Sequence, residues 1–143
     1  MATLDSGKTI VAWTTESEEG ANSGVEARVL TGSKMGEVFS LARGGDARHW
    51  GQQIAALGGE RFAVLWNSSG RDQPGQGIYG RSFSGERSGG GPVFRVNVFG
   101  EGDQRMGALG RLSGGRMAVA WQSHGQDGDG WGVYARVLKL RRP

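Results

Sequence analysis

One residue pattern recurs three times along the chain in constant register, and it constrains the fold more than any other feature of the sequence. Three tryptophans stand 53 and 55 residues apart, a leucine precedes each by nine positions, and an arginine follows each by 15. The copies differ in length only between the arginine and the next leucine, where loops would lie, so the chain is a tandem repeat. The landmark residues are Leu4, Trp13 and Arg28, then Leu57, Trp66 and Arg81, then Leu112, Trp121 and Arg136.

Runs of β-branched and aromatic residues separated by glycines fill each copy, as is typical of β-strands joined by tight turns. The chain has 28 glycines and only 3 prolines in 143 residues, and each glycine would cost about 1 kcal/mol inside a helix. No segment shows helical spacing of apolar residues, so essentially no α-helix is predicted. The predicted strands, after a strand end and turn in 1–7, are 8–14, 25–30, 38–41, 53–57, 61–67, 77–83, 93–98, 106–112, 116–122 and 133–140.

These strands predict an all-β chain of tandem four-stranded antiparallel sheets that resemble propeller blades. We assign 1–143 to a single repeat domain with copies of approximately 1–46, 47–103 and 104–143, the last without a fourth strand. A closed propeller needs about 4 to 8 blades, whereas this chain supplies about two and a half. It is therefore a fragment of a longer array, or one of several chains that complete a ring, or a three-sheet β-prism that closes on itself. The first two arrangements expose sheet edges, so we expect self-association or a larger assembly.

Composition and charge exclude several classes of protein. The formal charge of +3 comes from 17 Lys and Arg against 14 Asp and Glu, and its excess lies mainly in the tail, which argues against a nucleic-acid-binding face. There is no cysteine, so disulfides and thiolate metal sites are excluded. No apolar run approaches the roughly 18 residues of a membrane span, and the first residues do not form a signal peptide. The location in the cell stays open.

The segment 121–134 resembles a tandem repeat of large bacterial secreted and surface proteins, where it often stands beside calcium-binding modules. The preceding residues 112–120 and the segment 94–97 fit the same repeat. The resemblance covers nearly the whole chain and is most specific in the third copy. It implies a propeller-like β-repeat used for adhesion or scaffolding, at an extracellular or cell-surface location, and it implies no known reaction.

The loop in the third copy places Asp127 and Asp129 between glycines, and Ca²⁺ prefers several oxygen ligands from flexible loops of this kind. These two aspartates are therefore the candidate calcium ligands. The alternative is that they shape a hairpin loop by accepting hydrogen bonds from backbone amides. Counted from each tryptophan, the acid at 127 recurs as Glu19 and Asp72, but Asp129 does not recur, and this pattern favours the alternative.

Two tryptophans break the repeat register. The three landmark tryptophans lie within apolar strands and are predicted to pack in the core, whereas Trp50 and Trp131 stand beside glycines in predicted loops. Exposed aromatic rings can stack on sugar rings, so we predict Trp131, with His124 and Gln126, and separately Trp50, as candidate ligand-binding residues. A tryptophan that caps its own sheet is an equally good interpretation.

The sequence shows no motif for catalysis. Neither His49 nor His124 lies in a nucleophile motif with a serine or cysteine, although paired carboxylates that meet only in space are invisible in a sequence. We expect a non-catalytic binding or structural module, a subunit of a larger complex or surface assembly. A carbohydrate-binding, lectin-like module is the alternative, and a glycan-active enzyme is the third hypothesis.

Overall fold

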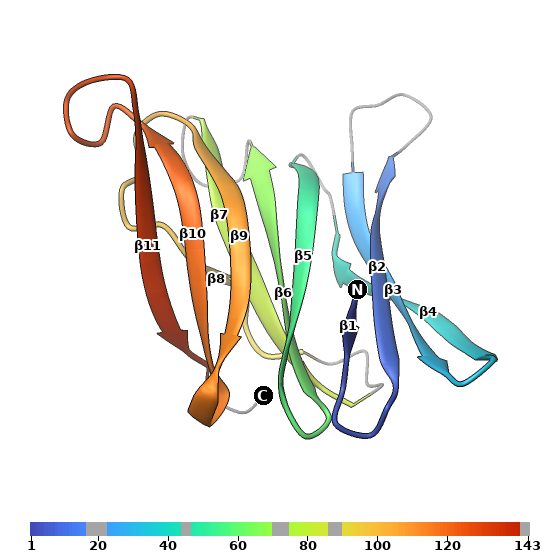
Figure 1. The fold of residues 1–143 in the computed structure, drawn as a ribbon. Coiled ribbons are helices and arrows are strands. Elements are labelled where there is room, and N and C mark those ends of the chain that lie inside the picture. Colours follow the sequence, from blue (N-terminus) through green and yellow to red (C-terminus); the bar gives the residue numbers. More distant parts are fainter. Residues whose placement is uncertain (17–22, 44–46, 70–74, 86–89, 141–143) are drawn as a thin grey trace.

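The computed structural model describes residues 1–16, 23–43, 47–69, 75–85 and 90–140, and these form three antiparallel sheets (Figure 1). The prediction of an all-β chain with tandem antiparallel sheets is confirmed. The described residues contain no α-helix and one turn of 3-10 helix, η1 (Ser113–Gly115). Sheet A contains β1 (Ala2–Thr3), β2 (Thr9–Glu16), β3 (Ser23–Thr31) and β4 (Lys34–Ala42); sheet B contains β5 (Arg48–Gly58), β6 (Arg61–Ser69), β7 (Gln76–Ser84) and β8 (Phe94–Arg95); sheet C contains β9 (Gln104–Leu112), β10 (Arg116–His124) and β11 (Trp131–Lys139).

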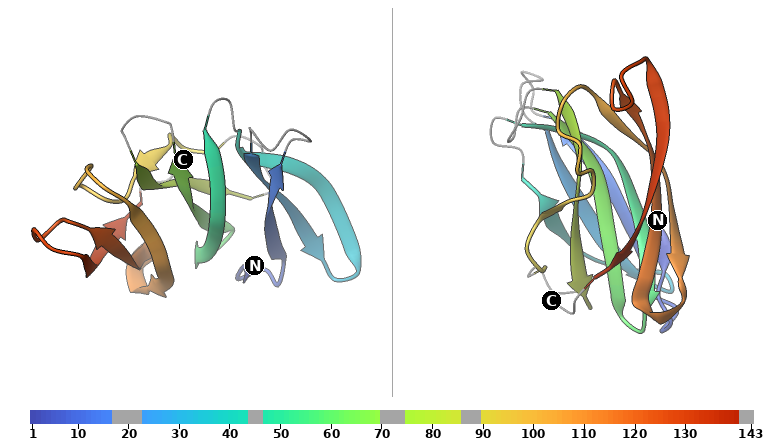
Figure 2. Two further views of the ribbon diagram at one scale, coloured as in Figure 1. Left: turned by 90° about the horizontal axis from the view of Figure 1, so that it is seen from above. Right: turned by 90° about the vertical axis from the view of Figure 1, so that its left-hand side faces the viewer.

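Each sheet is an up-and-down meander in which consecutive strands are hydrogen-bonded neighbours. Seen from above, the sheets stand side by side with sheet B between sheets A and C (Figure 2). This open arrangement differs from the β-prism given as an alternative, in which the first and third sheets would also pack face to face. No helix in the described part of the chain is long and apolar enough to cross a membrane.

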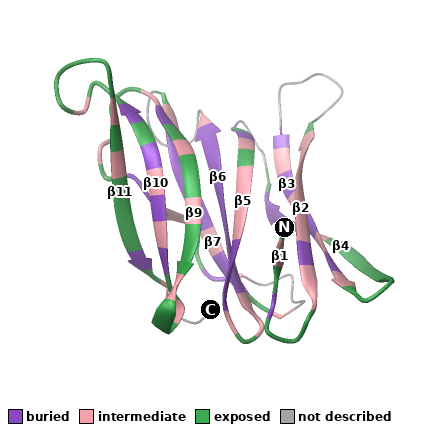
Figure 3. Cartoon of the chain, viewed as in Figure 1, coloured by how far each residue is buried: buried purple, intermediate pink, exposed green. Residues whose placement is uncertain are grey.

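The core consists of two apolar clusters, one on each side of sheet B. The first joins sheet A to sheet B through residues such as Ile10, Val25, Phe62 and Trp66, and the second joins sheet B to sheet C. Strand β6 is buried on both faces, and β11 is largely exposed (Figure 3). The apolar run of β6 from Phe62 to Trp66 is typical of a strand with both faces covered.

The repeat register defines two faces in every sheet. We call the face that carries the landmark tryptophan the tryptophan face, and the opposite face the reverse face. Residues Ile10, Val25, Ala27 and Val29 on the reverse face of sheet A pack against Phe62, Val64 and Trp66 on the tryptophan face of sheet B. Residues Ala63, Leu65 and Ile78 on the reverse face of sheet B pack against Met117, Val119 and Trp121 on the tryptophan face of sheet C. The sheets therefore stack head to tail.

The residue after each of the first two landmark tryptophans bridges to the next sheet. The Thr14 hydroxyl donates to the Gln52 side-chain oxygen in β5 at 2.7 Å. At the equivalent position, the Asn67 side-chain oxygen accepts a hydrogen bond from the Met106 N–H in β9 at 2.9 Å. The third member of the series is Gln122, and it is exposed.

Asp5 connects all three sheets at one end of the molecule. It lies in the turn between β1 and β2, and its carboxylate accepts hydrogen bonds from the Gly59 N–H at 2.5 Å and from Arg111 Nη1 at 3.3 Å. Gly59 belongs to the turn between β5 and β6, and Arg111 belongs to β9. These contacts hold the pKa of Asp5 below its ordinary value, chiefly through the Gly59 backbone hydrogen bond and then through Arg111.

Three strands differ most in length from the prediction. Strands β4 and β5 are longer than 38–41 and 53–57, because their added residues pair with β3 and β6 although they show no apolar alternation. The predicted strand 93–98 is reduced to β8. It ends because the Asn97 side-chain oxygen, and not a backbone carbonyl, accepts from the Ile78 N–H at 2.9 Å. The Asn97 amide then donates to the buried Gln104 side chain at 2.7 Å, which fixes the path from sheet B to sheet C.

Candidate binding surface at the outer hairpin of sheet C

The loop between β10 and β11 is a closed hairpin that holds most of the candidate site residues. Its closing pair is His124 and Trp131, which are direct neighbours in the strand register. The Gly125 N–H donates to the Gly130 carbonyl at 2.8 Å. Gly125 has a φ of 73°, a left-handed conformation that glycine adopts without the steric cost of a side chain. The glycines predicted to punctuate strands thus act here as turn residues.

Trp131 lies in a polar cluster at the start of β11. Its side chain is 45% exposed, and the His124 ring meets it edge-on with ring centroids 5.2 Å apart. The Arg105 guanidinium lies over the indole, 4.7 Å from the ring centroid, and Arg105 also forms an ion pair with Asp103 at 3.8 Å. The structure therefore brings Trp131 and His124 together as predicted, and adds Arg105, which is distant in the sequence and carried no signal.

Asp127 is oriented toward Tyr134 in β11. The tyrosine hydroxyl forms a hydrogen bond with the Asp127 carboxylate. The pKa of Tyr134 is raised, first because the hydroxyl is partly buried, and then because of the negative charge of Asp127 and this hydrogen bond. This contact agrees with the interpretation that Asp127 shapes the hairpin.

Asp129 is exposed and Gln126 is half-buried in the same loop. Within the described ranges, no group of three or more His, Cys, Asp or Glu side chains could hold a metal ion. Calcium binding by Asp127 and Asp129 stays a prediction, and the equivalents Glu19 and Asp72 lie outside the described residues.

Trp50 does not join this cluster. It lies in β5 of sheet B and, with His49 and Arg48, lines a cavity of about 260 Å³ that also includes Glu16 and Ser23 of sheet A. His49 is buried: its backbone N–H donates to the Ser23 hydroxyl, which in turn donates to the His49 carbonyl at 2.9 Å. These contacts give His49 a role in joining sheets A and B.

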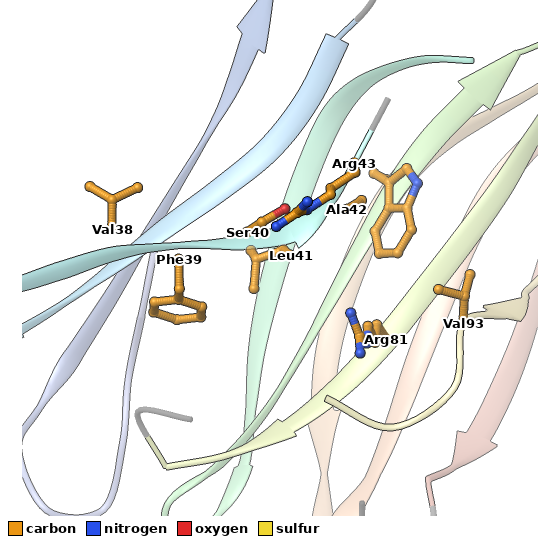
Figure 4. A pocket seen from close by; sticks show the side chains of 9 residues that line it. Val38, Phe39, Ser40, Leu41, Ala42, Arg43, Arg81 and Val93 are labelled. Carbon is orange, nitrogen blue, oxygen red and sulfur yellow. The ribbon is translucent and has the colours of Figure 1, made fainter. Parts of the chain in front are cut away.

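A larger cavity, of about 520 Å³, opens between sheets A and B on the side of β4. Figure 4 shows Phe39 and Leu41 of β4 on one side and Arg81 and Val93 on the other. The Nε and Nη2 atoms of Arg81 donate to the carbonyls of Gly91 and Gly90 at 2.7 and 3.1 Å. The landmark arginine of this copy therefore holds the segment before β8 in place, and the cavity had no counterpart among the sequence predictions.

The reverse face of sheet C is an exposed apolar surface that sequence reasoning missed. Val133 is 78% exposed and Val137 is 56% exposed, and Ala135 between them is also exposed. The repeat itself could have indicated this surface, because Val133, Ala135 and Val137 occupy the same repeat positions as Val25, Ala27 and Val29. Beside this face, β11 has β10 as its only hydrogen-bonded neighbour among the described strands.

Neither a protein-family model, nor a curated protein sequence, nor a solved structure matches this chain.

Proposed function

We propose that this chain is a non-catalytic assembly module, built from propeller-blade-like β-repeats, that associates through the exposed surfaces of its sheets. One observation carries the proposal. Strand β11 leaves its outer edge unpaired within the described residues, whereas the equivalent strands β3 and β7 pair there with β4 and β8. A row of unpaired backbone N–H and C=O groups is a template for another chain.

The surface beside this edge supports the same function. Soluble monomers rarely expose contiguous apolar surface without a functional reason, and the reverse face of sheet C exposes Val133, Ala135 and Val137 in line along β11. The resemblance of segment 121–134 to repeats of bacterial surface proteins agrees with an adhesive or scaffolding role. Protein partners and further copies of this chain are both compatible with these surfaces.

Light scattering behind a sizing column tests this proposal, with the chain loaded over about a hundredfold range of concentration. Association predicts a mass that rises with concentration above the 15.2 kDa of one chain. A constant mass of one chain, together with turnover of a glycan substrate by the same sample, would contradict the proposal and favour the enzyme.

The exposure of Trp131 favours carbohydrate binding as the second candidate function. Its ring is 45% exposed, and Arg105 and His124 lie against it as polar neighbours. Aromatic rings beside such groups suit the apolar faces of sugars. A glycan array tests this candidate: binding should disappear in Trp131→Ala and persist in Trp131→Phe, which keeps an aromatic ring. The absence of any wild-type signal, or a signal unchanged in Trp131→Ala, would exclude this site.

A further inference from the structure

The two intramolecular interfaces follow one rule, which leaves one face of each outer sheet without a partner among the described residues. The reverse face of sheet A covers the tryptophan face of sheet B, and the reverse face of sheet B covers the tryptophan face of sheet C. The uncovered surfaces are therefore the reverse face of sheet C and the tryptophan face of sheet A. They are the two complementary halves of the interface that the chain already forms twice.

The reverse face of sheet C repeats a face that is buried elsewhere in the same chain. Val133, Ala135 and Val137 occupy the positions of three residues in sheet A that have the same side chains. The register fixes this equivalence, because Trp13 pairs with Glu26 in β3 as Trp121 pairs with Tyr134 in β11. The residues in sheet A are Val25, Ala27 and Val29, which are 0%, 0% and 4% exposed against sheet B. The exposed valines of β11 thus have the composition of an interface.

The tryptophan face of sheet A has the matching character. Val11 and Trp13 occupy the positions of Val64 and Trp66 in sheet B, and Trp66 is fully buried beneath sheet A. Trp13 instead keeps part of its surface exposed and belongs to neither apolar cluster, contrary to the prediction that all three landmark tryptophans pack in the core. The physical reason is that the apolar cluster of described residues that joins sheet A to sheet B does so through the reverse face of sheet A, and neither cluster includes the tryptophan face of that sheet.

Polar groups also lie on the two uncovered faces. Glu26 stands on the tryptophan face of sheet A, at the position held by tyrosine in the other copies. The reverse face of sheet C carries the exposed amide of Gln122, with Arg105 as its register partner in β9. Gln122 occupies the position from which Thr14 and Asn67 bridge to the following sheet.

We propose that a second copy of this chain stacks the tryptophan face of its sheet A on the reverse face of sheet C. This proposal rests on the assembly function proposed above and names its partner and its interface. The contact is heterologous, so repeated addition closes a ring if the rotation permits and extends a filament if it does not. Stacking sheet C on sheet C would place valine and alanine against the same small side chains, and would leave Trp13 uncovered.

Two variants, each blocked at one face, test this interface by mixing. Val133→Glu/Val137→Glu places charges on the reverse face of sheet C, and Trp13→Glu places one on the tryptophan face of sheet A. Each blocked variant should lose self-association by about 100-fold or more, because an unpaired charge would be buried at the contact. An equimolar mixture should form a 1:1 dimer and nothing larger, since each variant keeps the face that the other lacks. The matched control is Val98→Glu, at a residue 83% exposed in the connection from sheet B to sheet C, which should assemble like the wild type.

The outcomes separate the interface from the assembly function. If the wild type associates but the mixture stays monomeric, or if Trp13→Glu associates as well as the wild type, the stacking proposal is overturned and the assembly function stands. If the wild type and Val98→Glu are both monomeric at every concentration, self-assembly and the stacking proposal fall together. Val11→Glu replaces Trp13→Glu as the sheet A variant if circular dichroism shows that the latter does not fold.

Discussion

The side-chain oxygen of Asn67 accepts a hydrogen bond from the backbone N–H of Met106 at 2.9 Å, and this bond joins sheet B to sheet C. Asn67 is 5% exposed. Truncation of its side chain would leave the Met106 N–H without this partner. Removing one partner of a buried hydrogen bond costs about 1–3 kcal/mol. We expect Asn67→Ala to lower the free energy of unfolding by about that amount, measured by urea denaturation of the Val133→Glu/Val137→Glu background.

The control for this prediction is Gln122→Ala in the same background. Gln122 occupies the equivalent position in sheet C but is exposed, so its substitution should change the free energy of unfolding by no more than about 0.5 kcal/mol. Equal effects of the two substitutions would show that the intersheet bond of Asn67 does not stabilise the stack.

Asp5 should make the stability of the fold depend on acid pH. Its pKa in the folded chain lies below its ordinary value, first because of the Gly59 N–H and then because of Arg111. The unfolded chain therefore binds a proton at higher pH than the folded chain does. The stabilisation is complete above the ordinary pKa of about 4, and is lost as the pH falls through the lower, folded value. Denaturation midpoints between pH 2 and 6 should fall more steeply for the wild type than for Asp5→Asn.

Arg111→Gln is the second arm of that measurement. It removes one partner of Asp5 and keeps the Gly59 hydrogen bond, so it should retain the larger part of the pH dependence. A wild-type profile that matches Asp5→Asn across this range would mean that the three-sheet contact is not formed in solution.

Tyr134 should titrate above its ordinary pKa, because it is partly buried and faces the Asp127 carboxylate. Its contribution to stability is complete below the unfolded pKa of about 10, and is lost as the pH rises through the folded value. Absorbance titration in a Tyr79→Phe background isolates Tyr134, since the chain has only 2 tyrosines. Asp127→Asn should lower the pKa of Tyr134 without returning it to the free value, since burial is the larger cause. An unchanged titration curve would place Asp127 away from the ring.

Trp66 and Trp13 should respond very differently to truncation, although they occupy the same position in the repeat. Trp66 is fully buried between sheets A and B, and a buried tryptophan cut back to alanine costs about 3–5 kcal/mol of stability. Trp13 lies on an uncovered face, so Trp13→Ala should cost less than about half as much under monomeric conditions. Similar denaturation midpoints for the two variants would contradict the assignment of the faces.

The repeat register was sufficient to predict three antiparallel sheets, because β2, β6 and β10 all follow from the spacing of the landmark tryptophans. It was not sufficient for β8, which is cut short by a side chain, Asn97, that takes the place of a backbone acceptor. The contact of Arg105 with Trp131 was also invisible, since it joins residues on strands β9 and β11 that are not adjacent.

Burial was the least predictable property, because it depends on what lies across the face of a sheet. Val25 and Val133 are identical residues at equivalent positions, yet one is fully buried and the other is 78% exposed. Local sequence could not distinguish them. The difference arises only from the presence of sheet B against one and the lack of a described neighbour against the other.

Chemical cross-linking tests the head-to-tail stack most directly. The chain has no cysteine, so only introduced cysteines would react. One cysteine is placed on each uncovered face, as Val11→Cys and Ala135→Cys, and the products of a short bis-maleimide are separated by size. The stacking account predicts a ladder of dimers, trimers and larger species for the double variant, and only monomers for each single variant. Dimers from Ala135→Cys alone, or no ladder from the double variant at concentrations where the wild type associates, would contradict it.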